Sequence, residues 1–266
     1  MNTMNAKAEI GIIGGTGVYD PNLLKDTQEI KITTPYGDPS DTIITGTLGQ
    51  KKVAFLNRHG PGHKIPPHMV NYRANIHALK QLGVTRILAP TAVGSLVEEY
   101  RPSDLVILDQ FIDMTHARTS TFYEKGQVCH ISVADPFCEP LRTLLIETAK
   151  KLNYPVHEKG TQVCINGPRF STRAESLMFK SWSAHTINMT LVPECVLARE
   201  KEICYASIAM VTDYDCWKEH NVTIDEVINT MKQNEEKVKT LLTKTIESIP
   251  KERTCTCKDA LKSALI

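Results

Sequence analysis

The sequence predicts an α/β fold, because short apolar runs alternate along the chain with longer stretches of helical spacing. The strand-like runs lie at residues 8–14, 52–57, 86–89, 104–108, 161–165 and 204–211. The helical stretches lie at residues 70–82, 139–152 and 223–249. Polar or glycine-rich clusters follow most of the strands, and open α/β sheets bind ligands at the carboxyl ends of their strands. We therefore expect these clusters to form one shared site.

The elements of the amino-terminal half are bounded by local signals. The first strand, Ala8–Gly14, reads AEIGIIG and runs directly into a glycine turn. A second strand, Lys52–Asn57, is followed by an arginine and a histidine. The helix expected over Val70–Leu82 stops at Gly83, and the strand Arg86–Ala89 leads into a turn of small residues.

The carboxyl-terminal half contains the longest predicted helix. Thr223 is suited to cap its first turn, which carries two acidic residues, and Pro250 ends it. The apolar run Cys204–Val211 is typical of a fully buried strand and ends at Thr212-Asp213-Tyr214-Asp215. A short helix is expected from Lys258 to the terminus.

Composition excludes several classes of function. The 266 residues include 31 basic and 30 acidic side chains, so the chain has no basic excess with which to bind a nucleic acid. No apolar run reaches the length of a membrane span, and the first residues do not resemble a signal peptide. We expect a soluble, cytoplasmic protein that binds neither membranes nor nucleic acids and acts on small molecules.

Two clusters have the chemistry of an anion site. Glycines in Gly14-Gly15-Thr16-Gly17 let the backbone approach a phosphate, although a plain structural turn remains open. A nicotinamide-dependent oxidoreductase is disfavoured, because the dinucleotide fingerprint needs a third glycine. In Arg58-His59-Gly60-Pro61-Gly62-His63 an arginine fork beside a histidine suits an oxyanion. A metal site from His59, His63 and His68 is the less favoured alternative.

Three further clusters are compatible with a bound nucleoside. Thr91–Ser95 offers hydroxyl and amide donors, and Gly167–Ser171 places Phe170 beside a hydroxyl, an arrangement that suits a stacked base. Asp213 and Asp215 follow a strand expected to be buried, where carboxylates need partners and where burial raises the pKa of a carboxyl group. Each of these clusters alone is also compatible with an ordinary loop or a capped helix.

Most of the eight cysteines stand singly in apolar contexts and are expected to be small buried hydrophobic residues. This group comprises Cys129, Cys138, Cys164, Cys195, Cys204 and Cys216. The pair Cys255-Thr256-Cys257 is different, because its spacing leaves open a tight disulfide or a soft-metal ligand set.

Taken together and in this order, the clusters resemble the trimeric purine nucleoside phosphorylase family. The resemblance runs from Ile10 to about Ile249 and is strongest in Gly167–Ser176, Asn188–Glu194 and Thr212–His220. It implies one domain over residues 1–266, with a central mixed β-sheet flanked by helices and a tail from about residue 251. It also implies a homotrimer with its sites at subunit interfaces, and it leaves open whether two trimers pair.

The resemblance assigns roles to individual residues. The positions that match the phosphate site are Thr16, Arg58, His59, Thr91, Ala92 and Thr190. The positions that match the nucleoside site are Phe170, Ser171, Met189, Asp213, Asp215, Ile224, Val227 and Ile228, together with His130 from a neighbouring subunit. No metal or organic cofactor is implied, because inorganic phosphate is a co-substrate.

The implied reaction is phosphorolysis of 5′-methylthioadenosine to adenine and 5-methylthioribose 1-phosphate. Asp213 is the expected general acid at purine N7, and it replaces the asparagine of the family's 6-oxopurine enzymes. The apolar face of Ile224, Val227 and Ile228 favours a methylthio group, although weaker turnover of adenosine is compatible with such a pocket. The alternative is a phosphorylase for inosine, guanosine or methylthioinosine.

Overall fold

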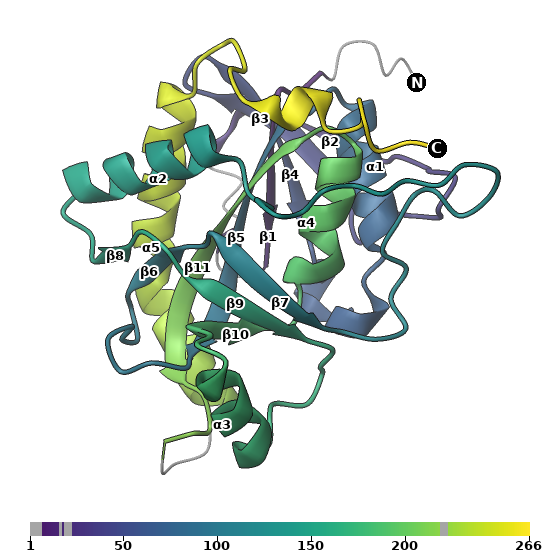
Figure 1. The fold of residues 1–266 in the computed structure, drawn as a ribbon. Coiled ribbons are helices and arrows are strands. Elements are labelled where there is room, and N and C mark those ends of the chain that lie inside the picture. Colours follow the sequence, from purple (N-terminus) through teal and green to yellow (C-terminus); the bar gives the residue numbers. More distant parts are fainter. Residues whose placement is uncertain (1–6, 16–17, 19–22, 219–222) are drawn as a thin grey trace.

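The structure is a computed structural model that describes residues 7–15, 18, 23–218 and 223–266. The strands are β1 (Ile10–Gly14), β2 (Lys25–Ile30), β3 (Ile43–Leu48), β4 (Lys51–Asn57), β5 (Arg86–Ser95), β6 (Leu105–Ile107), β7 (Gln110–Met114), β8 (Val156–His157), β9 (Thr161–Ile165), β10 (Thr186–Asn188) and β11 (Cys204–Tyr214). The helices are α1 (Tyr72–Gln81), α2 (Glu139–Lys151), α3 (Arg173–Ser181), α4 (Leu191–Glu200) and α5 (Ile224–Ser248). Within the described residues, these strands form one sheet (Figure 1).

The sheet is mixed, and β5 lies at its centre. Parallel pairs join β4 to β1, β1 to β5 and β5 to β11, whereas β10 and β3 are antiparallel to their neighbours β5 and β4. Along one edge β5 pairs first with β1 and then with β10, and its other edge pairs with β11 over its whole length. The predicted central mixed sheet flanked by helices is confirmed.

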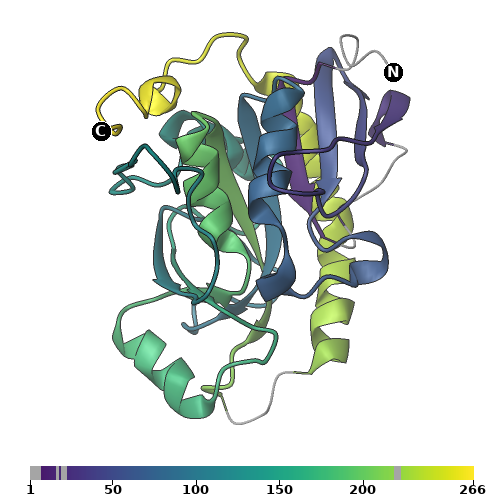
Figure 2. The same ribbon diagram turned by 90° about the vertical axis from the view of Figure 1, so that its right-hand side faces the viewer.

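Alternation along β11 separates two apolar layers. Side chains of Tyr205, Ala209 and Val211 pack in the layer that contains α1 and α4, whereas Ala206 and Ile208 pack in the layer with α2 and α5. This is the period-two pattern of a strand buried on both faces, as the run of apolar residues predicts. Figure 2 looks onto α1 and α4, which lie side by side over the sheet.

The carboxyl ends of β1, β4, β5 and β11 meet at one edge of the sheet, because these four strands run parallel. The register of β11 on β5 shifts between Val211 and Asp213, so that Asp213 lies opposite Gly94 and Tyr214 opposite Ser95. An extra residue in one strand is a β-bulge, which re-aims the side chains that follow it.

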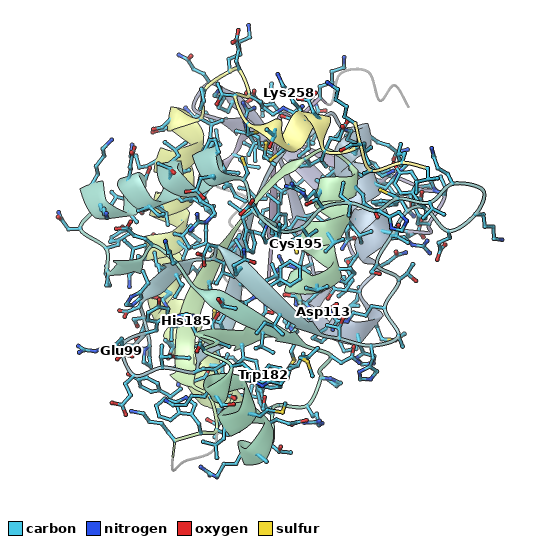
Figure 3. The ribbon with its side chains drawn as sticks, viewed as in Figure 1. Glu99, Asp113, Trp182, His185, Cys195 and Lys258 are labelled. Atoms are coloured by element: carbon cyan, nitrogen blue, oxygen red, sulfur yellow. The ribbon has the colours of Figure 1, made fainter. Side chains whose placement is uncertain are left out.

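Some elements differ from the sequence prediction. The polar edge strand β2, its neighbour β3, the short strands β7, β8 and β10, and helices α3 and α4 were not predicted. The helix expected from Lys258 is instead a 3-10 turn at Thr256–Asp259, and Leu265 beyond it pairs with Cys129. The tail crosses the top of the molecule, where Figure 3 labels Lys258. No helix in the described part of the chain has the length and hydropathy needed to cross a membrane.

Candidate active site

A cavity of about 980 Å³ opens at the carboxyl ends of the central strands. The predicted site residues that line it are Arg58, His59, Thr91, Ala92, Phe170, Ser171, Met189, Thr190, Asp213, Asp215, Ile224, Val227 and Ile228. Thr16 lies outside the described residues, although its neighbour Gly15 lines the cavity. His130 does not line it, since its backbone N–H donates to the Ala264 carbonyl near the carboxyl terminus.

Arg58 is held by protein groups rather than open to a ligand. Its Nε and Nη2 atoms each donate to a carboxylate oxygen of Glu194 over 2.7 Å. Nη2 also donates to the Ile13 carbonyl and Nη1 to the Pro90 carbonyl. One of the five guanidinium N–H groups therefore remains for an anion. The guanidinium fork binds Glu194, so the contact of Arg58 with phosphate that the sequence predicts depends on the remaining N–H group.

The Arg58–Glu194 pair is fully buried, with side chains 3% and 0% exposed. Burial lowers the pKa of Arg58, but the charge and hydrogen bonds of Glu194 outweigh this effect and give a net rise. Tyr205 donates its hydroxyl to the same carboxylate over 2.8 Å. A buried ion pair needs such additional hydrogen bonds to offset desolvation, so Tyr205 completes the site.

His59 is a neutral imidazole in the free protein. Burial and the Arg58 charge lower the pKa of His59 to about 4. Its Nδ1 lies 2.9 Å from the Ile65 carbonyl, which accepts only, so Nδ1 carries the proton. The Nε2 atom then has a free lone pair. The ring also stacks on His63, with 4.1 Å between centroids.

Hydroxyl groups from β5 and from the start of α4 meet in the cavity wall. Thr91 Oγ1 lies 3.5 Å from Thr190 Oγ1, and Asn188 Nδ2 donates to Thr91 Oγ1 over 3.3 Å. Asn188 Oδ1 is buried and has no hydrogen-bond partner among the described residues. An unpartnered buried acceptor in the wall of a cavity is suited to a ligand hydroxyl.

Both aspartates are buried at the end of β11, where Asp213 is 4% and Asp215 3% exposed. Thr212 Oγ1 lies 2.6 Å from Asp213 Oδ2. Burial raises the pKa of Asp215, and the hydroxyls of Ser176 and Ser171 partly oppose this rise. A Cβ on Gly94 would lie 3.0 Å from Asp213 Oδ1, so the carboxylates depend on a glycine in the facing strand.

The opposite wall is built by the loop before α3. Thr172 and Glu175 form a reciprocal capping box that sets the start of this helix. Phe170, just before it, is 40% exposed and lines the cavity. Gly167 has a φ of 62°, and a Cβ there would lie 2.5 Å from the sulfur of Met189. Only glycine allows both this conformation and this contact.

The first turn of α5 adds apolar side chains to the cavity wall. Ile224 and Ile228 are 59% and 45% exposed, and Val227 is half-buried. These three residues lie on one face of the helix, as their i, i+3, i+4 spacing predicts.

The proposed histidine metal site receives no support. Among the described residues, the one group of three or more His, Cys, Asp or Glu side chains with clustered ligand atoms contains four cysteines. His63 and His68 are both exposed.

Sequence reasoning missed Glu194, Asn188 and Gly94 as members of the site. Glu194 could have been suspected, because it is an acidic residue in the apolar stretch Leu191–Ala198, where a charge needs a partner. Asn188 is the last residue of the short strand β10, and its sequence context carried no distinctive signal. Gly94 had an apparent role as a turn residue, but the structure places it inside β5.

Comparisons with known proteins agree with this geometry. The model of the phosphorylase superfamily matches residues 9–247. S-methyl-5′-thioadenosine phosphorylase from Hyperthermus butylicus is 56% identical over 98% of this chain and 97% of its own length. The enzyme of that name from Saccharolobus solfataricus is 55% identical over 100% of both chains.

A solved structure shows the same arrangement. A variant of adenosine/methylthioadenosine phosphorylase from Schistosoma mansoni, in complex with methylthioadenosine, superposes with a TM-score of 0.91. It is 45% identical, over 97% of this chain and 96% of that one. Sequence, fold and an anion-compatible cavity thus agree, and the chain belongs to the phosphorylase superfamily as a nucleoside phosphorylase.

Proposed function

We propose that this chain catalyses phosphorolysis of 5′-methylthioadenosine. A phosphate oxygen attacks C1′ of the ribose, the bond from C1′ to purine N9 breaks, and N7 gains a proton. The products are adenine and 5-methylthioribose 1-phosphate. Phosphate is a substrate of this step, which involves no metal or organic cofactor. Relatives named S-methyl-5′-thioadenosine phosphorylase, at about 55% identity over the whole chain, support this choice of substrate.

The observation that carries the proposal is the register of β5 against β11. Pairing of Ala209 with Thr91 and of Asp213 with Gly94 brings the hydroxyl-bearing second half of β5 and two buried carboxylates to one cavity. The hydroxyl groups are suited to an anion and the carboxylates to the polar edge of a purine. A nucleoside with its C1′ between them would meet phosphate on one side and a proton donor on the other.

The phosphate end consists, in this proposal, of the free Arg58 N–H, His59, Thr91, Ala92 and Thr190, together with Thr16. His59 offers Nε2, which accepts a proton more readily once a dianion lies against it. Binding of phosphate is therefore accompanied by protonation of His59, and the positive charge then stabilises the bound anion. Asn188, with its unpartnered oxygen, is our candidate for a ribose hydroxyl.

Asp213 is the candidate general acid. The single proton of the Thr212 hydroxyl has two acceptors within reach, the Val93 carbonyl at 3.2 Å and Asp213 Oδ2 at 2.6 Å. When Thr212 donates to Asp213 Oδ2, a proton on Oδ1 stays available for transfer to the substrate. Asp213 in this protonated form is able to donate to N7, and Asp215 then accepts from the 6-amino group.

The 5′ end of the substrate is proposed to contact the apolar face of α5. Ile224, Val227 and Ile228 offer no hydrogen-bond partner to a 5′-hydroxyl, and a thioether requires none. A hydrophobic pocket excludes an added hydroxyl weakly, so slower turnover of adenosine is expected.

The active assembly is proposed to be a homotrimer, in which a neighbouring subunit supplies His130. Phe170, Ile224 and Ile228 are large apolar side chains that are 40–59% exposed beside the cavity in the single chain. A neighbouring subunit at the cavity mouth would cover them and would bring its own His130 to the ribose.

A substrate panel tests the proposal. Purified protein is incubated with 5′-methylthioadenosine, adenosine, inosine, guanosine or methylthioinosine, each with and without phosphate, and the free base is measured by chromatography. We expect phosphate-dependent release of adenine, fastest from 5′-methylthioadenosine. Release of hypoxanthine or guanine in preference to adenine would instead assign the 6-oxopurine reaction.

A further inference from the structure

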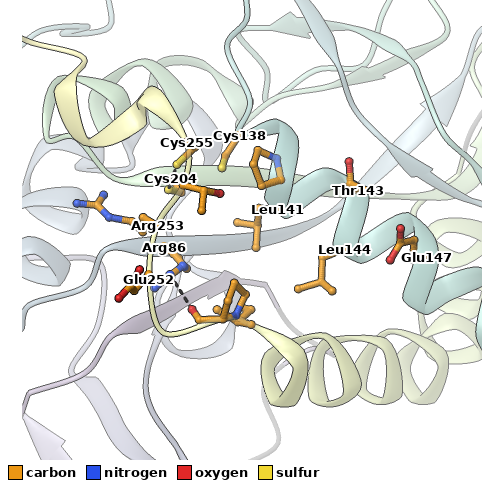
Figure 4. A pocket seen from close by; sticks show the side chains of 14 residues that line it. Arg86, Cys138, Leu141, Thr143, Leu144, Glu147, Cys204, Glu252, Arg253 and Cys255 are labelled. Atoms are coloured by element: carbon orange, nitrogen blue, oxygen red, sulfur yellow. Dashed lines mark hydrogen bonds between the residues drawn. The ribbon is translucent and has the colours of Figure 1, made fainter.

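Four cysteines from three separate parts of the chain meet beneath the carboxyl-terminal tail. Cys138 immediately precedes α2, Cys204 begins β11, and Cys255 and Cys257 lie in the tail itself. Cys138 and Cys204 are buried in the apolar core, as the sequence predicts, but their sulfur atoms also lie beside those of Cys255 and Cys257. Figure 4 shows Cys138, Cys204 and Cys255 pointing toward one another beside a cavity of about 230 Å³.

The spacing of the four sulfur atoms suits one metal ion. All four Sγ atoms lie within 4.8 Å of one another, and Cys204 Sγ is 3.3 Å from Cys255 Sγ. Zinc bonded to sulfur at about 2.3 Å places its four ligands about 3.8 Å apart in a tetrahedron. A disulfide would require two of these atoms to approach to about 2.05 Å, and the structure joins none of the eight cysteines in a disulfide.

The surroundings also suit a closed structural site. Cys138, Cys204 and Cys257 are buried and Cys255 is half-buried, so four protein ligands would leave no position for water or substrate.

The charge of such a site would be offset nearby. Zinc with four thiolates carries a net charge of about −2. Arg86 and Arg253 line the same cavity, and Figure 4 shows both on the side of the cysteines. These arginines also hold the tail, because Arg86 donates to the Pro250 carbonyl over 2.8 Å and Arg253 to the Glu202 carbonyl over 2.7 Å.

The cluster is separate from the active site. Cys204 and Asp213 lie at opposite ends of β11, and nine residues of strand span roughly 30 Å. None of the four cysteines lines the catalytic cavity.

We propose that Cys138, Cys204, Cys255 and Cys257 bind one Zn²⁺ ion that fastens the carboxyl-terminal tail to the start of β11 and α2. Binding replaces four S–H bonds by four Zn–S bonds and releases four protons to solvent, with no change of oxidation state. The ion stabilises the folded chain and takes no part in phosphorolysis.

Metal analysis of the whole protein, purified in the presence of reductant, tests the proposal. We expect about one zinc per chain by mass spectrometry of the elements. Exchange for Co²⁺ should give the intense sulfur-to-cobalt absorption and the visible bands of a tetrahedral thiolate site. The double variant Cys255→Ser/Cys257→Ser should lose at least nine-tenths of the bound metal, whereas Cys129→Ser, outside the cluster, should keep it.

The proposal would be overturned if the reduced, folded protein took up no Zn²⁺ from a competing chelator. A cobalt spectrum without the features of a tetrahedral thiolate site would also overturn it. So would two disulfides among these four cysteines in the native protein. The cobalt and chelator measurements use the unaltered chain, so they decide the question even if the double variant does not fold. Adenine release should be unchanged in Cys129→Ser, which serves as the folding control.

Discussion

At the scale of single residues, Arg58 and His59 line the same cavity but have different surroundings. Arg58 donates four of its five N–H groups to protein acceptors, so it contributes a fixed positive charge and a single contact. Burial and the Arg58 charge lower the pKa of His59 and keep the ring neutral until an anion binds. Arg58 therefore supplies a permanent positive charge, whereas His59 supplies a positive charge only after it gains a proton.

The lowered pKa of His59 predicts acid sensitivity in phosphate-free buffer. The unfolded chain binds a proton at this ring near pH 6.5, but the folded chain does so only near pH 4. Acidification through this window favours the unfolded state, by up to ~3 kcal/mol for a shift of this size. Between pH 7 and 4, the free energy of unfolding measured with denaturant should fall less for His59→Gln than for the parent protein.

Exposed His116→Gln is the matched control and should follow the parent curve. Equal slopes for His59→Gln and the parent protein would contradict the assigned pKa. In kinetic assays, His59→Gln should raise KM for phosphate more than it lowers kcat.

Among the substitutions considered, Asp213→Asn is expected to lower the rate of phosphorolysis the most. In Asp213→Asn the amide has no proton of suitable acidity for N7, so turnover of 5′-methylthioadenosine should fall by ~100-fold or more. Turnover of 6-oxopurine nucleosides should be retained or gained, because the amide is able to donate to O6. Asp259→Asn, the same change on the exposed tail, should leave both rates unaltered. Full activity of Asp213→Asn would refute its role as the acid.

At the scale of elements, the bulge in β11 and the glycine opposite it place the carboxylates. Because the register shifts after Val211, Asp213 faces Gly94 rather than a residue with a side chain. The facing strand thus makes room for the acid, and the helix α5 closes the other side of the cavity.

Gly94→Ala should therefore damage catalysis more than stability. The new Cβ would lie 3.0 Å from Asp213 Oδ1 and 3.3 Å from Asp215 Cβ, so one or both carboxylates must move. A displacement of this kind is expected to lower kcat by ~10-fold or more. Gly11→Ala introduces a similar contact, 3.1 Å from Val84, but in the core away from the aspartates. If the two variants lost activity equally, the steric argument would fail.

At the scale of the whole molecule, the single chain lacks one expected site residue. His130 lies near the carboxyl terminus, away from the cavity, which agrees with our proposal that it serves a neighbouring subunit. Large apolar side chains left exposed at the cavity mouth point to the same arrangement.

Mixed trimers test this directly. His130→Ala and Asp213→Asn should each be poorly active alone, since every site lacks one group. When the two variants are unfolded together and reassembled, some sites receive Asp213 from one chain and His130 from its neighbour. Activity should then rise several-fold above either variant, as measured by adenine release. Each variant reassembled alone is the control, and the absence of any gain would show that the sites are not shared.

Much of the fold followed from local patterns. The strands β1, β4, β5, β6, β9 and β11 and the helices α1, α2 and α5 were predicted, because apolar spacing over a few residues reports burial on one face or two. Helix α3 and the strands β2, β7, β8 and β10 were not predicted, since their sequences are polar or too short to show a period. Strand β3 was not predicted either. The kinked start of α4 interrupts its helical pattern at Val192.

Neighbouring residues along the chain were enough to predict the alternation of strands and helices and the polar clusters that follow the strands. Only the tertiary structure decided that Arg58 grips Glu194, 136 positions away, and that four dispersed cysteines share one cluster. It also decided that Asp213 faces a glycine. Such contacts depend on strand order, register and one bulge, and these arise from packing that no local spacing encodes.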